Sequence, residues 1–466
     1  MSRPKITLED MFDLTGSEIF NPDTFIATSN VSTDTRTIVR NSVFIALKGE
    51  KFDGHNFVDA AISKGVSAVV INRNKLKKFD HLDVTIITVP DTTTAYGELA
   101  TAYRKKLSAK VVAITGSNGK TTTKEILSSL LSEKFKVTKT LSNNNNHIGV
   151  PLTIFSADMK TDILVLELGT NHFGEIKYTA HIAQPDYSVI TNIGQSHLEY
   201  LKDLEGVAGE KMALFEETEA CGGKLFVNND DTLIKEKTRK MKDKTTFGLK
   251  GRCDIRGSIK GVGKNGETIL NIATSKKNFD VKVPLLGQTN AQNFLTAAAI
   301  ALELGLSKTD IIKAASKLTA VDKRLNLVSY NSFELINDTY NSNPESMRSA
   351  FRFMKAYAGK RRKIAVLGDM FELGDETERI HREMAHEVIT NGISEIYTTG
   401  KMMALLNEEL VNAGKNAVHF RNRRSLASFL SRLDKSDSLV LLKGSRGMKM
   451  EEFIPYIGQQ PDNYRQ

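Results

Sequence analysis

The sequence predicts an α/β protein of three domains, and three observations support this. The chain has 466 residues, which is too long for one ordinary hydrophobic core. An apolar run, a glycine-rich loop and a helical pattern follow one another in VVAITGSNGKTTTKE, from Val111 to Glu125. Short apolar runs alternate with helical patterns along the chain, which is typical of parallel sheets with crossover helices. We expect a small N-terminal α/β domain over 1–107, a central domain with a largely parallel sheet over 108–321, and a second doubly wound, Rossmann-like domain over 322–466.

The glycine-rich loop TGSNGKTT has the residues that a phosphate-binding loop needs. Gly116 and Gly119 allow the backbone to bend and its N–H groups to approach an anion. Lys120 supplies a charge for the β- and γ-phosphates, and Thr121 supplies a hydroxyl for magnesium. The standard loop has a further glycine where this chain has Ile114, so an ordinary βα turn with a chance lysine is the alternative. The order of strand, glycines, Lys-Thr-Thr and helix favours a P-loop mononucleotide-binding sheet with ATP as its ligand. The residues expected to contact ATP here are Thr115, Gly116, Ser117, Asn118, Gly119, Lys120, Thr121 and Thr122.

In the first domain, 43–47 and 67–72 are predicted strands, and 58–65 is a predicted helix that ends at a glycine. Two polar segments lie beside these strands, Asp34-Thr35-Arg36 and Asp53-Gly54-His55. From the residue types alone, each segment fits a solvated turn as well as a binding loop.

In the central domain, 163–168, 187–193 and 224–228 are predicted strands. Ligands of such sheets bind at the carboxyl ends of the strands. Glu167 and His197 lie at or just after such ends, so both are expected on the same rim as the phosphate loop. Further along, 252–283 predicts an antiparallel patch with an Asn265-Gly266 turn, and 287–305 predicts an alanine-rich helix. The third domain has predicted strands at 363–367, 395–399 and 438–443, and predicted helices at 379–390 and 402–412.

Composition excludes several classes of protein. Forty per cent hydrophobic and 26% charged residues are typical of a globular protein, and no apolar run has the length of a membrane span. The first residues lack the apolar core of a secretory signal, and the two cysteines lie far apart, which suits a reducing cytosol. The net charge of +9 comes from scattered residues, without the basic and aromatic stripe of a nucleic-acid-binding surface. We expect a cytoplasmic protein that neither inserts into a membrane nor binds nucleic acid.

Several polar residues near the phosphate loop are candidates for chemistry. Glu167 ends an apolar strand and, with Thr121, would satisfy the preference of magnesium for oxygen ligands; a strand-end charge facing water is the alternative. His197 follows the next strand, although a lone histidine is more often a hydrogen-bonded loop residue. Lys211 lies in the helical stretch EGVAGEKMALFE, and its residue type alone predicts a surface lysine.

Two further groups lie later in the chain. Asn290 and Asn293 begin the alanine-rich helix, where one of them is a plausible N-cap and both amides could contact adenine. Arg324, Asp338 and Asn341 lie where the third domain begins. An arginine that binds phosphate and an aspartate that accepts from ribose hydroxyls are reasonable roles there.

Seven motifs resemble those of the Mur ligases, ATP-dependent amino-acid ligases of bacterial cell-wall synthesis. The resemblance extends from Thr33 to Glu452. TGSNGKTTTKE is shared with folylpolyglutamate synthetases, whereas three other motifs are more specific to the branch that adds D-alanyl-D-alanine. These three are NDTYNSNPESM (337–347), VLGDMFELG (366–374) and LKGSRGMKMEE (442–452). The remaining motifs are NNNNHIGVPLT (143–153), LELGTNHFGEI (166–176) and TNIGQSHLEYL (191–201).

The resemblance implies a role for each candidate residue. Lys120 would bind the γ-phosphate, and Thr121 with Glu167 would hold one magnesium ion. His197 and Lys211 would hold a second, with Lys211 carbamylated. The implied catalytic set is Lys120, Glu167, His197, Lys211 and Arg324.

The same resemblance assigns the remaining contacts. Asn290 and Asn293 would contact ATP, and Arg324 and Asp338 would reach phosphate and ribose from the third domain. The sequence departs from the family at Thr289, where the pattern has histidine, and this departure bears on the contacts at the adenine side and not on the reaction. The UDP-sugar peptide or the dipeptide would be contacted by Asp34, Thr35, Arg36, Asp53, Gly54, His55 and Asn341.

The implied reaction joins D-alanyl-D-alanine to a UDP-N-acetylmuramoyl-tripeptide through an acyl phosphate, in a protein expected to be a monomer. Another Mur ligase or a folylpolyglutamate synthetase is the alternative within the same class. A non-catalytic nucleotide-binding scaffold or a nucleic-acid-binding ATPase is the alternative from another class, against which the complete set of candidate catalytic residues argues.

Overall fold

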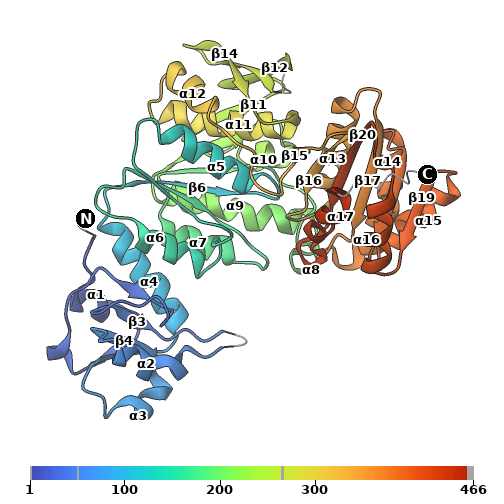
Figure 1. The fold of residues 1–466 in the computed structure, drawn as a ribbon. Helices are drawn as coiled ribbons and strands as arrows, with labels where there is room; N and C mark the ends of the chain where they lie inside the picture. Colours follow the sequence, from blue (N-terminus) through green and yellow to red (C-terminus); the bar gives the residue numbers. More distant parts are fainter. Residues whose placement is uncertain (1–2, 50–51, 264–266, 459–466) are drawn as a thin grey trace.

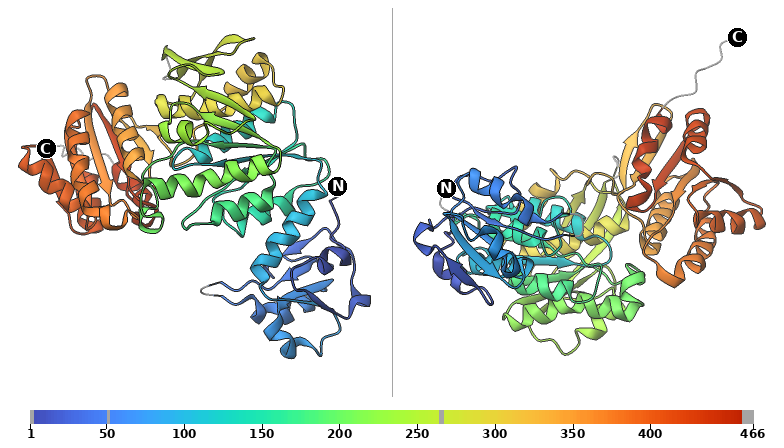
Figure 2. Two further views of the ribbon diagram at one scale, coloured as in Figure 1. Left: turned by 180° about the vertical axis from the view of Figure 1, so that it is seen from behind. Right: turned by 90° about the horizontal axis from the view of Figure 1, so that it is seen from below.

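The computed structural model describes residues 3–49, 52–263 and 267–458. Its strands form three separate sheets in chain order, each packed with helices (Figure 1). The first and third of these units lie apart from each other, each against the central one, as the two views of Figure 2 also show. The architecture is the three-domain α/β arrangement that the sequence predicts.

The first sheet has five strands, and only β1 runs antiparallel to its neighbour. In order across the sheet the strands are β1 (Glu18–Phe20), β5 (Thr85–Val89), β4 (Ala68–Asn72), β3 (Val43–Ile45) and β2 (Val31–Ser32). The helices are α1 (Leu8–Phe12), η1 (Pro22–Thr24), η2 (Gly54–Phe57), α2 (Val58–Ser63), η3 (Arg73–Lys75), α3 (Leu76–Phe79) and α4 (Thr92–Lys105). The segments 34–36 and 53–55 follow the parallel neighbours β2 and β3, so both lie toward the same edge of this sheet.

The central sheet has nine strands. Across the sheet they are β14 (Asn278–Val283), β13 (Thr268–Ala273), β12 (Ile255–Val262), β11 (Lys244–Gly248), β10 (Lys224–Asn228), β9 (Tyr187–Ile190), β6 (Lys110–Thr115), β8 (Ile163–Glu167) and β7 (Val137–Lys139). The strands from β7 to β12 are parallel, whereas β13 and β14 pair antiparallel, as predicted for this part of the chain. The predicted Asn265-Gly266 turn lies outside the described residues.

Strand β6 is apolar from Val111 to Ile114 because both of its faces are covered there. Val111 and Ala113 belong to the hydrophobic core shared with α4, α6 (Gly149–Ser156) and α7 (Glu175–Ala183). Val112 and Ile114 belong to the opposite core, shared with α5 (Lys120–Leu131) and α11 (Gly287–Glu303). A parallel strand buried on both faces reads as a continuous apolar run, which is why the strand could be predicted from sequence.

The strand order also places the site. Beyond β6 the chain crosses to the sheet edge at β7 and returns through β8, and then passes to the other side of β6 at β9. The order therefore reverses around β6, and in open α/β sheets ligands bind at such a switch point beside the carboxyl ends of the strands. The phosphate loop, Glu167 and the segment 191–197 follow β6, β8 and β9, so this crevice brings them together.

The third sheet has six strands, all parallel to their neighbours except β15. Across the sheet they are β15 (Asn326–Ser329), β16 (Phe333–Asp338), β20 (Ser438–Lys443), β17 (Arg362–Gly368), β18 (Glu395–Thr399) and β19 (Asn416–Phe420). Its helices are α13 (Pro344–Tyr357), η4 (Gly374–Glu376), α14 (Thr377–Thr390), α15 (Met403–Asn412), α16 (Arg423–Arg432), η5 (Arg446–Met448), η6 (Met450–Phe453) and α17 (Ile454–Gly458).

The remaining central helices are α8 (Leu198–Leu201), α9 (Leu204–Ala220), α10 (Thr232–Lys237) and α12 (Lys308–Ala315). The predicted domain boundaries at 107/108 and 321/322 fall between elements, after α4 and before β15, and stay predictions. Within the described part of the chain, no helix is long and apolar enough to cross a membrane.

Candidate active site

The two glycines of the phosphate loop are required by the geometry around them. Gly116 has φ +147° and Gly119 has φ +81°, a backbone region that favours glycine. A Cβ on Gly116 would lie 1.9 Å from Oγ1 of Thr191, and one on Gly119 would lie 2.4 Å from Oδ1 of Asn293. The loop is therefore enclosed by neighbouring segments.

The segment after β9 holds the loop in shape. Backbone N–H groups of Ser117 and Asn118 donate to the carbonyl and to Oδ1 of Asn192, both at 3.0 Å. Oγ of Ser117 donates to the carbonyl of Gly194 at 3.0 Å. Across the domain boundary, Nδ2 of Asn343 donates to Oδ1 of Asn118 at 3.0 Å.

Lys120 begins α5 and folds back over the loop. Its Nζ donates to the carbonyl of Gly116 at 2.5 Å. Burial, opposed by the charge of Glu167 and assisted by that of Arg324, lowers the pKa of Lys120 to about 8. A desolvated ammonium at the centre of a phosphate loop gains most when an anion binds beside it.

Two polar side chains contact Thr121, and a third reaches one of them. Its Oγ1 donates to Oε1 of Glu167 at 3.1 Å and accepts from Nη2 of Arg324 at 3.0 Å. Nδ2 of Asn145 donates to the same Oε1 at 3.0 Å. Oε2 of Glu167 is buried and has no hydrogen-bond partner among the described residues. Asn145 was not among the predicted site residues, although it lies within the motif NNNNHIGVPLT.

His197 connects the central domain to the third. Its Nδ1 lies 2.6 Å from Oε2 of Glu372, a contact at ion-pair distance but without the angles of a hydrogen bond. The neighbouring His197 lowers the pKa of the Glu372 carboxyl. The N–H of Glu199 also donates to the Glu372 carbonyl at 3.2 Å. Sequence analysis did not single out Glu372, although it lies in the motif VLGDMFELG.

The residue type of Lys211 predicts a surface position, and this prediction is wrong. Lys211 is not a surface lysine: its side chain is 1% exposed. Among the residues that the structure describes, none makes a hydrogen bond or ion pair with its Nζ. Burial lowers the pKa of Lys211 well below its usual value, and the nearby charge of Lys120 lowers it further. Neighbouring Glu210 acts in the opposite direction, but its carboxylate accepts from the N–H groups of Gly174 and Ile176, both at 2.7 Å.

The prediction that Asn290 or Asn293 is an N-cap is wrong. Helix α11 already begins at Gly287, and no side chain caps it. Nδ2 of Asn290 donates to the Leu286 carbonyl at 2.9 Å. Both asparagines are buried, and Asn293 lies beside Gly119 of the phosphate loop.

In the third domain, Arg324 stacks on the ring of Tyr340 with 4.0 Å between Cζ and the ring centroid. Asp338 is buried, and its Oδ2 accepts from Nζ of Lys443 at 2.6 Å. Oδ1 of Asn341 accepts from the N–H of Arg446 at 3.2 Å. Of the three predicted residues, only Arg324 makes a described hydrogen bond to the phosphate-loop side, and the nucleotide role of Asp338 stays a prediction.

In the first domain, the segment 34–36 is more open than the segment 53–55. The Asp34 carboxylate accepts from Nη2 of Arg36 at 2.7 Å, and this contact lowers its pKa to about 2. The carbonyl of Thr35 accepts from Nζ of Lys64 at 2.6 Å. The side chain of Arg36 is 86% exposed, so it is accessible to a ligand although it is paired with Asp34.

The second segment is held more tightly. Nδ1 of His55 lies 2.6 Å from Oδ1 of Asp53, while its Nε2 accepts from the N–H of Asn72 at 2.9 Å. A Cβ on Gly54 would lie 2.6 Å from the Leu47 carbonyl. Both ring nitrogens are therefore already engaged, and the substrate-binding role of both segments stays a prediction.

Within the described ranges, no group of three or more His, Cys, Asp or Glu side chains is arranged to hold a metal ion. Oxygen donors at the first predicted magnesium position come instead from a hydroxyl and one carboxylate, Thr121 and Glu167. That set fits magnesium, which usually takes one or two protein ligands and completes its shell with phosphates and water.

Comparison with known proteins assigns the family. The chain matches the "Mur ligase family, catalytic domain" over 28–104, the "Mur ligase middle domain" over 114–301 and the "Mur ligase, glutamate ligase domain" over 323–446. It is 35% identical to the UDP-N-acetylmuramoyl-tripeptide–D-alanyl-D-alanine ligase of Bacillus subtilis (strain 168), over 98% of this chain and 99% of that protein. The chain belongs to the Mur ligase family. The resemblance predicted from the seven motifs is confirmed.

Solved structures agree with this assignment. MurF from Acinetobacter baumannii superposes on this Mur ligase with a TM-score of 0.87 and 29% identity, over 99% of this chain and 100% of that chain. The MurF ligase from Thermotoga maritima in complex with ADP gives a TM-score of 0.82 and 27% identity, over 92% and 97% of the two chains. The full-length likeness includes all three sheets, so this Mur ligase has the domain arrangement of those proteins.

Proposed function

We propose that this Mur ligase uses ATP to join D-alanyl-D-alanine to the terminal carboxylate of UDP-N-acetylmuramoyl-tripeptide, releasing ADP and phosphate in peptidoglycan precursor synthesis. The named ligase from B. subtilis aligns over nearly the whole of both chains, which supports the choice of substrates. The alternatives are another Mur ligase or a folylpolyglutamate synthetase-like amide ligase.

One structural observation carries the ATP-dependent part of the proposal. The phosphate loop, the Glu167 carboxylate and an arginine from the third domain meet at the hydroxyl of Thr121. Lys120 and Arg324 both contact residues of the phosphate loop, which supports a role for these two cations at the terminal phosphates. Fixed charges aimed at a migrating phosphoryl group are the main source of catalysis in phosphoryl transfer.

The reaction needs two steps because a carboxylate is a poor acyl donor. Its oxygen first attacks the γ-phosphorus of ATP, the bond to the β-phosphate oxygen breaks, and an acyl phosphate and ADP form. The amine of D-alanyl-D-alanine then attacks the acyl carbon through a tetrahedral intermediate, an amide bond forms, and phosphate leaves as the amine loses a proton. The acyl phosphate must be kept from water, so the contacts of Asn343 and Glu372 with the central domain are expected to close the site.

Magnesium would be held first by Thr121 and Glu167, supported by Asn145. The fit rests on the contacts that these side chains share at Oε1 of the buried Glu167 carboxylate. When bound, magnesium would neutralise negative charge on the phosphates. Lys120 and Arg324 orient the same phosphates from two domains.

A second magnesium would be held by His197 and Lys211. An unmodified ammonium does not fit a cation site, whereas a lysine carbamate offers a negative charge and two oxygens. The lowered pKa of Lys211 supports this modification, because a neutral amine is the form that adds to CO2.

We further propose that the protein works as a monomer in the cytoplasm, with no nucleic-acid partner. Release of phosphate from ATP tests the function, with UDP-N-acetylmuramoyl-tripeptide present and with or without D-alanyl-D-alanine. Phosphate should accumulate only when both are present. Single amino acids, glutamate among them, should not replace the dipeptide as the acceptor. Phosphate release that depends on a single amino acid and not on D-alanyl-D-alanine would show that the protein is a different ligase. A salt-dependent gel shift with DNA would favour the nucleic-acid alternative.

A further inference from the structure

Lys124 is a buried lysine beside the predicted magnesium position. It lies one helical turn after Thr121 on α5, and its side chain is only 1% exposed. Its Nζ makes no hydrogen bond within the described part of the chain. The atoms at ion-pair distance are both carboxylate oxygens, Oε1 of Glu125 at 3.2 Å and Oε2 of Glu167 at 3.5 Å. A buried cation is costly unless opposite charge lies next to it, so one of these carboxylates accounts for its place.

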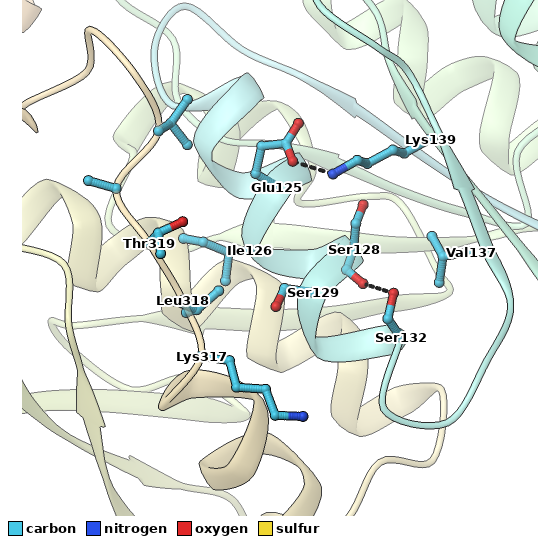
Figure 3. Close-up of a pocket in the computed structure, with 12 residues that line it drawn as sticks. Glu125, Ile126, Ser128, Ser129, Ser132, Val137, Lys139, Lys317, Leu318 and Thr319 are labelled. Carbon is cyan, nitrogen blue, oxygen red and sulfur yellow. Dashed lines mark hydrogen bonds and ion pairs between the residues drawn. The ribbon is translucent and has the colours of Figure 1, made fainter.

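Glu125 already has a cation of its own. Nζ of Lys139 forms an ion pair with Oε2 of Glu125. The pair lines a groove of about 350 Å³ between α5, the end of β7 and the segment 317–321. Figure 3 shows the two side chains pointing toward each other. Both side chains are about one-third exposed, so water also solvates this pair. Glu125 would therefore remain compensated without Lys124.

Among the described residues, Lys124 is the only cation at ion-pair distance from Glu167. The side chain of Glu167 is 3% exposed, and its Oε1 is used by Thr121 and Asn145. The Nζ of Lys124 is the ammonium that lies opposite Oε2, at 3.5 Å. The carboxylate is therefore held from two sides, by hydrogen bonds at Oε1 and by charge at Oε2.

We propose that Lys124 is a positioning residue that fixes Oε2 of Glu167 and thereby turns Oε1 toward magnesium and the phosphates. This rests on the proposed ATP-dependent function, since it gives Glu167 a metal to bind. Groups behind a metal ligand orient it, and their loss typically lowers metal affinity or activity by about 10–100-fold. The competing explanation is that Lys124 merely neutralises Glu125.

Three variants separate these explanations. Lys124→Met keeps the length and volume of the side chain and removes its charge. Lys124→Met/Glu125→Gln removes one charge of each sign, so the double variant keeps the net charge of the parent, and any loss that it shows cannot come from an unpaired Glu125. Lys134→Met is the control, because Lys134 is an exposed lysine just after the same helix and donates to the Gly305 carbonyl.

Binding of Mn²⁺ to the protein–ADP complex, followed by electron paramagnetic resonance, is the first readout. The proposal predicts weaker Mn²⁺ binding in both Lys124 variants, by about 10-fold or more. It also predicts a similar loss of kcat, with KM for the UDP-substrate within about 2-fold of the parent and the control. Unfolding midpoints measured on the same samples show whether each variant is folded.

A double variant with parental Mn²⁺ affinity and kcat would overturn the proposal, because Lys124 would then be only the counter-ion of Glu125. Tighter Mn²⁺ binding in either variant would also overturn it, since Lys124 would then be competing with the metal for Glu167. The measurement of Mn²⁺ binding uses ADP and neither the UDP-substrate nor the dipeptide. A parent that binds Mn²⁺–ADP but does not ligate D-alanyl-D-alanine would therefore count against the proposed substrates and not against the role of Lys124.

Discussion

Nη2 of Arg324 donates a hydrogen bond of 3.0 Å to Oγ1 of Thr121, although the two residues belong to different domains. Thr121 lies in the first turn of α5, whereas Arg324 lies just before β15 and stacks on Tyr340 of the third domain. Any movement of the third domain must therefore move a positive charge relative to the phosphate loop. The same contact makes Arg324 a sensitive place to test how closure and chemistry are linked.

Replacing Arg324 by methionine should lower kcat by about 100-fold, because one charged donor to the migrating phosphoryl group is lost. ATP together with the UDP-substrate should compact the parent protein, and less so the Arg324→Met variant, as measured by small-angle scattering. Arg432→Met, an exposed arginine on α16, is the control and should behave as the parent. Equal compaction and near-parental kcat in Arg324→Met would contradict the role given to this residue.

Lys120→Ala should abolish turnover and leave the fold intact. The lost charge acts most strongly on the γ-phosphoryl group during transfer, and removal of such a donor costs on the order of 100-fold or more in rate. Phosphate release and circular dichroism measure the two parts of this expectation. Lys160→Ala removes an exposed lysine and serves as the control; turnover by a folded Lys120→Ala protein at a rate close to that of this control would rule out the phosphate-loop assignment.

A buried histidine supports the segment that reaches His197. Nε2 of His381 accepts from the N–H of Met370 at 3.1 Å, and its Nδ1 lies 2.7 Å from the Thr377 carbonyl. The neutral ring therefore donates from Nδ1 and accepts at Nε2. Burial lowers the pKa of His381 below its usual 6.5, because the charged form loses its hydration.

The sign of the pH effect follows from this lowered pKa. As pH falls through about 6.5, the unfolded chain takes up a proton at this position before the folded chain does. Lowering the pH further should therefore lower the free energy of unfolding. His381→Gln keeps an acceptor for Met370 but does not titrate. Its stability difference from the parent should shrink between pH 7.5 and 5.5 in urea unfolding, whereas exposed His386→Gln should change nothing. A difference that stays constant with pH would contradict this account.

Features formed by residues close together in the sequence could be predicted from it. The strand, loop and helix around Lys120 are contiguous, and the apolar run of β6 directly reflects burial on both faces. Residue types alone also indicated that Glu167 and His197 would share a rim with the loop, because parallel strands end at the same edge of a sheet.

Features that depend on packing between distant segments were missed or wrong. The contact of Glu372 with His197 joins two domains, and no spacing in the sequence specifies it. Lys211 was predicted at the surface from its residue type, but α9 packs against α7 and β9 and buries it. The N-cap prediction at Asn290 is wrong because α11 begins about one turn earlier, at Gly287, whose φ is +84°. No side chain caps this end of the helix. Only the family resemblance singled out Lys211 as a site residue.

Lys211 provides the sharpest test of the proposed second magnesium position. Lys211 is a buried amine without a hydrogen-bond or ion-pair partner among the described residues, and burial holds its pKa well below the usual value. A lowered pKa favours the neutral form of the amine, which is the form that can react with CO2. The carbon of CO2 bonds to Nζ, one amine proton is released, and the product is an anionic carbamate. Protein prepared with ¹³C-bicarbonate should therefore show one carbamate signal by NMR that is absent from Lys211→Arg.

Lys211→Arg should also be as inactive as Lys211→Ala in ligation. Arginine keeps the positive charge and approximate length of the side chain but forms no such carbamate, so it cannot supply the two hard oxygens that magnesium prefers. ATP binding through Lys120 and Thr121 should remain close to that of the parent in both variants, which isothermal calorimetry can measure. Lys235→Arg, an exposed lysine on α10, is the matched control and should ligate normally. If Lys211→Arg ligated D-alanyl-D-alanine at nearly the parental rate, the amine would be only a buried packing residue, and the second magnesium would have to be held without it.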